Sequence, residues 1–93
     1  MANIDNIVRR IKSNHDEVTI EYVNDTYLTY VNIKGIYESY CQVSYCKENN
    51  MCDMLLTVIK SKDGCYNNDL YWLSKRTDDW LYGKIIDVIS TKC

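Results

Sequence analysis

Several residue types that usually organise a domain are missing or scarce in this sequence. Among 93 residues there is no phenylalanine, no proline, one histidine and three glycines. Without proline, repeats or low-complexity segments, the chain shows no sign of a domain boundary, and glycines that stand alone exclude a phosphate-cradling loop. No apolar run approaches the roughly 18 residues that a membrane span needs. We therefore predict a soluble protein with one compact domain covering residues 1–93.

Charge is scattered along the chain rather than gathered. Eleven basic side chains face thirteen acidic ones, for a net charge of −2, and the longest runs are pairs such as Arg9-Arg10 and Asp78-Asp79. A domain that binds nucleic acid usually shows a stripe of basic residues. A domain that mimics nucleic acid usually shows a stripe of acidic residues. The absence of both argues against direct nucleic-acid binding. The first five residues contain no basic segment before an apolar signal core, so we expect a cytoplasmic location, in the host cell.

Two amphipathic helices are predicted, one near each end of the chain. Between residues 3 and 13, apolar residues recur at helical spacing, namely Ile4, Ile7, Val8 and Ile11. Asn3 can cap this helix, and Asp5 suits the positive end of its dipole. Thr77 followed by two aspartates marks the start of the second helix. Its apolar stripe consists of Leu81, Ile85, Val88 and Ile89.

Between the helices the apolar period changes to two, which is typical of half-buried strands. Strands are predicted from residue 17, then over 26–34, 36–46 and 51–60, with turns at Asn24-Asp25 and Lys62-Asp63-Gly64 and a polar loop at 47–50. Residues 70–76 fit either a strand or a helical turn. The predicted class is α+β: an N-terminal helix, an antiparallel sheet of three to five strands, and a C-terminal helix packed on one face.

The five cysteines do not have the spacing of a metal site. They are Cys41, Cys46, Cys52, Cys65 and Cys93. Structural zinc ligands usually come in pairs two to four residues apart. Free thiols in a reducing cytoplasm are the favoured interpretation, with a disulfide such as Cys46–Cys52 or a zinc site as alternatives. No cofactor or metal is predicted. His15 is not linked to any cysteine by a local pattern, so no catalytic residue is proposed and we expect no enzyme.

The nine tyrosines are the most informative feature of the sequence. Tyrosine joins a large apolar ring to a hydroxyl group. A chain that uses tyrosine instead of phenylalanine therefore places its rings on surfaces that are partly exposed to water. Tyrosine and tryptophan also anchor protein interfaces without a charged field. The alternative is that many of these rings are core edges with hydroxyls in water. The predicted partner-binding residues are Tyr22, Tyr27, Tyr30, Tyr37, Tyr40, Tyr45 and Trp72.

The first residues of the chain resemble those of a known protein family. The run Asn3-Ile4-Asp5-Asn6-Ile7-Val8-Arg9-Arg10-Ile11-Lys12-Ser13, followed by Val18-Thr19-Ile20, resembles the start of small phage anti-CRISPR proteins that inhibit the nuclease of type II systems. The resemblance covers the first fifth of the chain. It implies a compact helix-and-sheet protein without enzymatic activity that occupies a surface its target needs. Those inhibitors tend to be strongly acidic because they imitate DNA, so at −2 this chain is not expected to mimic DNA, and none of their contact residues is carried over.

The leading hypothesis is a non-enzymatic phage or mobile-element protein that inhibits a host defence protein, such as a CRISPR effector, by protein–protein binding. Heavy use of isoleucine, asparagine, tyrosine and lysine, all encoded by AT-rich triplets, agrees with such a source. A second hypothesis is a sponge for a signalling nucleotide, whose base would stack on tyrosines. A third is a zinc-stabilised interaction module. A tyrosine-rich edge strand can also pair with its own copy and form a homodimer.

Overall fold

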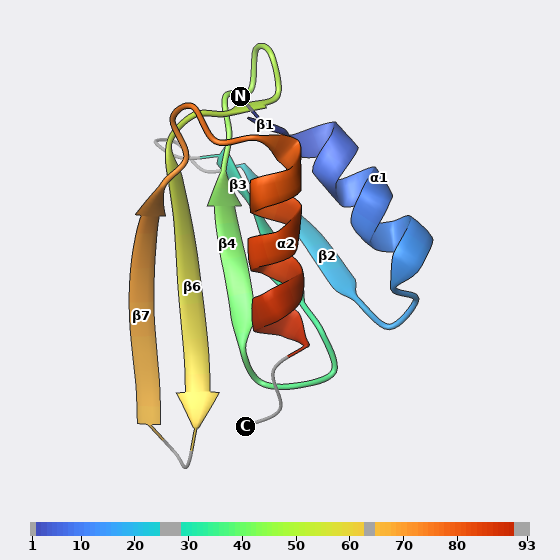
Figure 1. The fold of residues 1–93 in the computed structure, drawn as a ribbon, viewed down its shortest axis with the longest axis vertical. Helices are drawn as coiled ribbons and strands as arrows, with labels where there is room; N and C mark the ends of the chain where they lie inside the picture. The colour runs from blue at the N-terminus through green and yellow to red at the C-terminus, as the bar shows by residue number, and fades with distance from the viewer. Residues whose placement is uncertain (1, 25–28, 63–64, 91–93) are drawn as a thin grey trace.

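The computed structural model describes residues 2–24, 29–62 and 65–90 (Figure 1). Helix α1 spans Ile4–Asn14 and helix α2 spans Asp78–Ile89. The strands are β1 (Ala2–Asn3), β2 (Thr19–Asn24), β3 (Thr29–Lys34), β4 (Tyr40–Ser44), β5 (Met51–Cys52), β6 (Leu55–Lys62) and β7 (Cys65–Trp72). The predicted α+β class, with a helix before and after an antiparallel sheet, is confirmed. Neither helix has the length and apolar character that a membrane span requires, among the described residues.

The main sheet has five strands in the order β2-β3-β4-β6-β7, and every neighbouring pair is antiparallel. Both helices lie on the same face of this sheet (Figure 1). Helix α2 crosses in front of β3 and β4, and α1 lies beside it toward β2, whereas β6 and β7 extend past the helices. The sheet therefore has one face that the helices cover in part and one that they leave open.

The core forms where the covered face meets the two helices. Alternate residues of the three central strands point into it and have no exposed surface: Val31, Ile33, Cys41, Val43, Leu56 and Val58. The helices contribute the apolar stripes predicted from their spacing, because all eight of those residues are buried. Burial of a side chain of this size contributes about 1.5 to 3 kcal/mol relative to exposure. The alternation of strands β3, β4 and β6 is thus explained by one buried face.

The starts of both helices are capped as the sequence predicts. The side chain of Asn3 accepts hydrogen bonds from the backbone N–H groups of Asp5 and Asn6, and Thr77 accepts one from Trp80. Each cap satisfies donors that the first helical turn would otherwise leave unpaired. The aspartate pair after Thr77 lies in the first turn of α2, where negative charge is favourable. These carboxylates have a structural role, as the sequence indicated.

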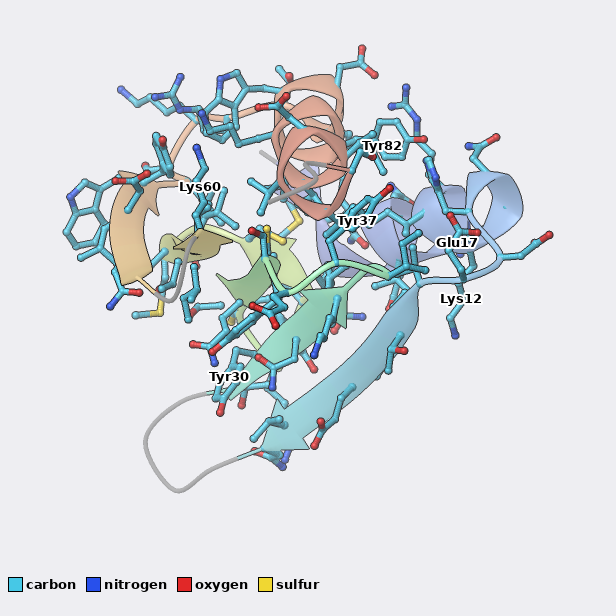
Figure 2. All side chains as sticks on the ribbon, turned by 90° about the horizontal axis from the view of Figure 1, so that it is seen from below. Lys12, Glu17, Tyr30, Tyr37, Lys60 and Tyr82 are labelled. Carbon is cyan, nitrogen blue, oxygen red and sulfur yellow. The ribbon has the colours of Figure 1, made fainter. Side chains whose placement is uncertain are left out.

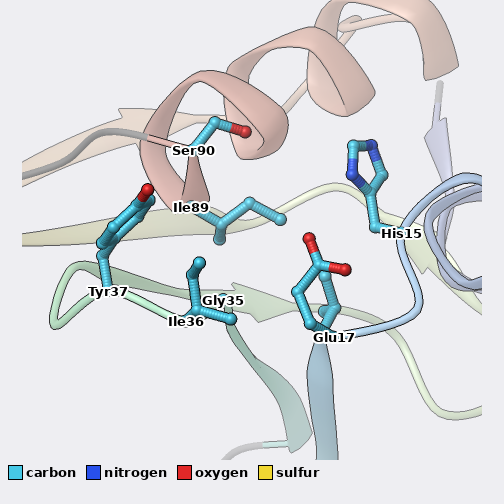
Figure 3. A pocket seen from close by; sticks show the side chains of 8 residues that line it. His15, Glu17, Gly35, Ile36, Tyr37, Ile89 and Ser90 are labelled. Carbon is cyan, nitrogen blue, oxygen red and sulfur yellow. The ribbon is translucent and has the colours of Figure 1, made fainter.

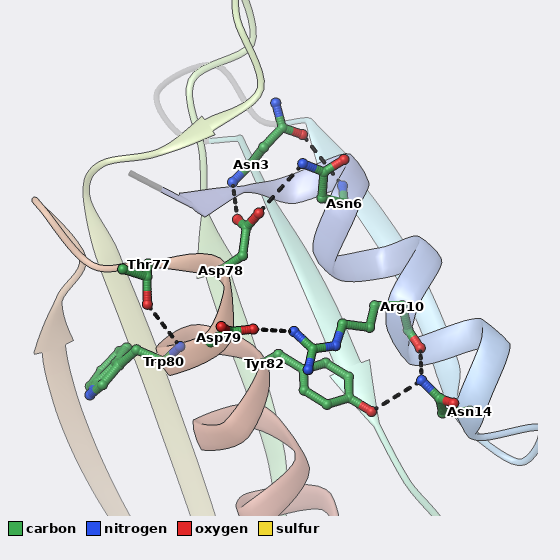
Figure 4. A network of polar contacts seen from close by, with 9 residues as sticks. All are labelled: Asn3, Asn6, Arg10, Asn14, Thr77, Asp78, Asp79, Trp80 and Tyr82. Carbon is green, nitrogen blue, oxygen red and sulfur yellow. Dashed lines mark hydrogen bonds and ion pairs between the residues drawn. The ribbon is translucent and has the colours of Figure 1, made fainter.

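A polar network joins the N-terminal ends of the two helices (Figure 4). Asp78 accepts hydrogen bonds from the backbone N–H of Asn3 at 2.9 Å and from Nδ2 of Asn6 at 3.5 Å. Nη1 of Arg10 lies 2.7 Å from Oδ1 of Asp79, and its guanidinium carbon lies 3.9 Å from the centre of the Tyr82 ring. This network fixes α1 beside α2 on the covered face.

Two strand predictions need correction. The predicted strand over 51–60 is wrong as a single element, because the chain breaks between β5 and β6 and β5 leaves the main sheet to pair with β1. The predicted strand over 36–46 begins only at Tyr40, since residues 36–38 form a bend. Of the predicted strand 26–34, the described part begins at Thr29. Residues 70–76 are resolved in favour of a strand that ends at Trp72, but its start at Cys65 was not predicted.

The glycine that precedes the bend, Gly35, has a steric reason. A Cβ atom placed on Gly35 would lie 2.6 Å from the backbone carbonyl oxygen of Ile89, at the end of α2. The chain therefore passes too close to the helix for a side chain at this position. Of the predicted turns, Asp25, Asp63 and Gly64 lie outside the described residues. The polar loop at 47–50 is present as a turn.

Candidate functional site

The face of the sheet opposite the helices is the candidate site, and we call it the open face. Residues paired across neighbouring strands share a face, so the positions that alternate with the core residues define it. They include Thr19, Glu21, Tyr30, Asn32, Lys34, Tyr40, Gln42, Leu55, Thr57, Ile59, Asn68, Leu70 and Trp72. Tyr30 projects on this side in Figure 2, whereas Tyr37 and Tyr82 lie on the side of the helices. No described element covers the open face.

The structure brings only three of the seven predicted partner-binding residues together on this face. Tyr30 of β3 and Tyr40 of β4 are half-buried, and Trp72 of β7 is 73% exposed. Tyr37 lies in the bend before β4, near the end of α2. Tyr27 lies outside the described residues.

Tyr22 and Tyr45 point to the other side of the sheet. Tyr22 pairs with the buried Val31, and Tyr45 packs against the hydrophobic core. Partial burial raises the pKa of both phenols, and the carboxylate of Asp5 on α1 raises them further. Both rings therefore lie on the helix side of the sheet. They are separate from the face on which Tyr30 and Tyr40 lie.

Sequence analysis missed the aliphatic part of the open face. Leu70 is 63% exposed and lies two residues before Trp72 on β7, so both side chains project from the same face. Leu55 and Ile59 of β6 are half-buried beside them, opposite Trp72 and Asn68. The alternation of leucine, threonine and isoleucine in β6 was a usable signal. It could not be assigned to a face until the register of β6 and β7 was known.

A shallow hollow of about 300 Å³ lies at the β2 side of the open face. Its walls are Thr19, Glu21, Asn32, Lys34, Tyr40 and Gln42. One cation and one anion border it, so its charges balance. The Oδ1 atom of Asn32 is buried and accepts no hydrogen bond from the residues that the structure describes. The hollow thus offers amide groups, one aromatic ring and little net charge.

A second, smaller hollow of about 180 Å³ lies between the bend before β4 and the end of α2 (Figure 3). His15 and Glu17 line one side of it, while Tyr37 and Ser90 lie on the other. Nε2 of His15 is 3.4 Å from the hydroxyl oxygen of Tyr82. Over the described ranges, no cluster of three or more histidine, cysteine, aspartate or glutamate side chains could hold a metal ion. This hollow offers one imidazole and one carboxylate but no third ligand.

Three of the five cysteines, Cys41, Cys46 and Cys52, are shown to be free thiols. Cys41 and Cys52 are buried and Cys46 is half-buried, so the alternative Cys46–Cys52 disulfide is absent. Burial raises the pKa of Cys41 and of Cys52 to about 12. The sulfur of Cys46 instead donates a hydrogen bond to Oε2 of Glu48 at 3.0 Å, which lowers the pKa of that carboxyl group. Because thiolates are the nucleophilic form, Cys41 and Cys52 are poor nucleophiles near neutral pH.

Comparison with known proteins adds no relative: no protein-family model, curated protein or solved structure matches this chain. The open face is therefore the feature of the molecule that bears on its function.

Proposed function

We propose that this chain is a small non-enzymatic protein that binds another protein through its open face. The observation that carries the proposal is the exposure of Trp72 and Leu70 on the same face of the sheet as Tyr30 and Tyr40, a face that no described element covers. Large aromatic side chains are enriched at the centres of protein interfaces. A face built only to meet water would carry charged and small polar groups at these positions.

The charge of the open face favours a protein partner over a nucleic acid. Lys34 and Glu21 are its charged residues among the positions named above, and they cancel. Nucleic-acid binding draws most of its affinity from lysine and arginine side chains that neutralise phosphates, even where bases stack on aromatic rings. The open face has aromatic rings but only one cation, Lys34, among the positions named above. Burying neutral aromatic surface against another protein needs no such field.

Inhibition of a host defence protein, such as a CRISPR effector, is the biological role that we propose for this binding. Support comes from the resemblance of residues 3–13 and 18–20 to small phage anti-CRISPR proteins and from the AT-rich residue usage. A protein of this size acts by occupying a surface that its target needs. The proposed place of action is the host cytoplasm, where such a target operates.

The test uses a purified type II CRISPR nuclease with its guide RNA as the probe. Wild-type protein should bind it in biolayer interferometry and slow its cleavage of DNA. Tyr30→Ala with Tyr40→Ala should weaken binding by about 30-fold or more, the equivalent of one interface residue worth at least 2 kcal/mol. The matched control is Tyr22→Ala, because Tyr22 is 51% exposed but lies on the other side of the sheet.

The experiment tests the identity of the target and the location of the interface separately. If wild-type protein does not bind the nuclease, the proposed target is wrong. If it binds and the double variant binds equally well, the open face is not the interface. Circular dichroism of each variant should match wild type, so that loss of binding is not loss of fold.

The hollow beside Tyr40 supports one alternative, a sponge for a signalling nucleotide. Asn32 and Gln42 offer amide groups that can pair with a base edge, and the ring of Tyr40 offers a stacking surface. A nucleotide at a hundredfold over its dissociation constant would stabilise the fold by about 2.7 kcal/mol. A thermal-shift screen of cyclic and linear nucleotides tests this, and the absence of any shift removes the alternative.

A further inference from the structure

Strand β7 is an edge strand, and none of the described elements covers its outer side. It is last in the order of the sheet and pairs only with β6 among the described strands. That pairing runs through eight consecutive residues without a bulge, so β7 is regular along its length. It is longer than β2, the other edge strand, which has six residues. Regular, uncovered edges are the ones that pair with another chain.

The register shows which backbone groups of β7 face outward. The N–H of Leu73 donates to the carbonyl oxygen of Met54 at 3.0 Å, one step beyond the pairing of Leu55 with Trp72. Hydrogen-bonded and non-hydrogen-bonded pairs alternate in antiparallel sheets. Tyr71 and Asp69 therefore direct their backbone groups toward β6. The N–H and C=O groups of Asn68, Leu70 and Trp72 point away from it, toward the free edge.

The usual protections of an edge strand are missing from β7. Its sequence contains no proline and no lysine, and its one charged residue is Asp69. Two of the most exposed large apolar side chains of the described protein, Leu70 and Trp72, lie on it. Proteins that keep an edge strand unpaired commonly place lysine, proline or a bulge there. The composition of β7 therefore indicates an edge strand that pairs with another chain.

We propose that β7 pairs antiparallel with β7 of a second copy of this chain, about a two-fold axis at Leu70. In this register Leu70 lies opposite Leu70 of the second copy, and Trp72 lies opposite Asn68 in both directions. All three residues are those whose backbone groups face outward, so each can exchange N–H···O=C bonds with its counterpart. The contact is isologous, as closed dimers require.

Charge favours this register over the one with its axis at Asp69. With the axis at Leu70, Asp69 lies opposite Tyr71 of the second copy. Nζ of Lys84 lies 4.3 Å from the centre of the Tyr71 ring, so a cation is near the incoming carboxylate. With the axis at Asp69, two carboxylates would face each other, which is unfavourable. The pairing at Leu70 thus places opposite charges together and keeps like charges apart.

The dimer joins two open faces into one continuous sheet surface. Leu70 of each copy meets its counterpart on that face, and each Trp72 lies beside Asn68 of the other copy. Tyr30 and Tyr40 belong to β3 and β4, away from this seam. Leu70 and Trp72 belong to both proposals, whereas the Tyr30→Ala, Tyr40→Ala double variant alters the partner site without altering the seam.

Sedimentation velocity over a dilution series tests the dimer. Wild-type protein should change from dimer to monomer on dilution, because a single strand pair makes a small interface. Leu70→Lys should be monomeric throughout, since two lysines would face each other at the axis. The matched control is Ile36→Lys, which alters a residue of similar exposure, 66% against 63%, away from β7 and should dimerise like wild type. A monomeric wild type, or a Leu70→Lys protein that still dimerises, overturns the proposal.

Thiol cross-linking tests the register. Opposite residues in a hydrogen-bonded antiparallel pair have Cα atoms about 5.5 Å apart, within the range that a disulfide spans. Leu70→Cys should form a covalent dimer under mild oxidation. Asn68→Cys should not exceed the wild-type background, because the two copies of residue 68 would be about 13 Å apart. Equal cross-linking of the two variants would overturn the register.

Discussion

The two faces of the sheet are built from the same strands but differ in composition and in exposure. Along β3, Val31 and Ile33 have no exposed surface, while Tyr30 and Asn32 alternate with them on the open face. The covered face is aliphatic and packed, whereas the open face carries rings, amides and two strongly exposed apolar residues. Alternation in a strand thus separates the residues that stabilise the fold from those available to a partner.

The largest effect is expected from a cavity in the covered face. Ile33→Ala should lower the free energy of unfolding by about 2 to 5 kcal/mol, because it removes buried methyl groups that neighbours cannot replace. Urea denaturation followed by circular dichroism measures the change. A loss below 1 kcal/mol, on the order of a surface substitution, would mean that the covered face is not tightly packed.

A somewhat smaller effect is expected where the sheet approaches α2. Gly35→Ala should destabilise the protein by about 1 to 3 kcal/mol, because the added Cβ would press against the backbone at Ile89. Gly83→Ala is the control, since nothing lies within 4 Å of a Cβ there. That exposed helical position should gain up to about 1 kcal/mol. If both substitutions shift stability in the same direction, the close approach is not what requires Gly35.

A buried thiol should make the covered face sensitive to alkali. Burial raises the pKa of Cys41 to about 12, whereas the thiol of an unfolded chain ionises near pH 9. As pH rises between these values, the unfolded state gains from losing the proton, so stability present below pH 9 is lost. At pH 10 the raised pKa of this cysteine should lower the free energy of unfolding by about 1 to 2 kcal/mol. Urea denaturation at pH 7 and pH 10 should show a smaller difference for Cys41→Ala than for wild type; equal differences would contradict this assignment.

The smallest effect is expected on the open face. Leu70→Thr keeps a residue suited to strands and alters a side chain that is 63% exposed, so the stability of dilute protein should change by no more than about 0.5 kcal/mol. Thermal unfolding at low concentration, where the proposed dimer is dissociated, provides the measurement. A larger loss would show that Leu70 supports the monomer, and the contrast between the faces would weaken.

Much of the fold could be predicted because its signals are local. Asn3 and Thr77 cap helices whose apolar stripes repeat within one or two turns, and the buried positions of β3 and β4 alternate in sequence. The pairing of β1 with β5 carried no such signal, because it joins two-residue strands 50 positions apart. The break at residues 53–54 likewise depends on where β5 finds its partner.

The candidate site was less predictable, because it depends on which face each ring occupies. Tyr22 and Tyr30 belong to neighbouring strands of one hairpin, yet the register places them on opposite sides of the sheet. Leu70 is unremarkable in sequence, and its exposure follows from its place on the open face of an edge strand. Sequence patterns identified the aromatic surplus, whereas tertiary pairing decided which of its members share a surface.

The network between the helix starts has a consequence for synthesis in the cell. Asn3 donates to Asp78, a contact between residues 75 positions apart, and Ala2 is fully buried beside it. Helix α1 can form early on the ribosome, but it cannot reach its final place until residue 78 has left the exit tunnel. The β2–β3 hairpin must wait for the same event before its buried face is covered. Docking of the first helix is thus expected to follow synthesis of α2 and to be one of the last steps in the folding of this domain.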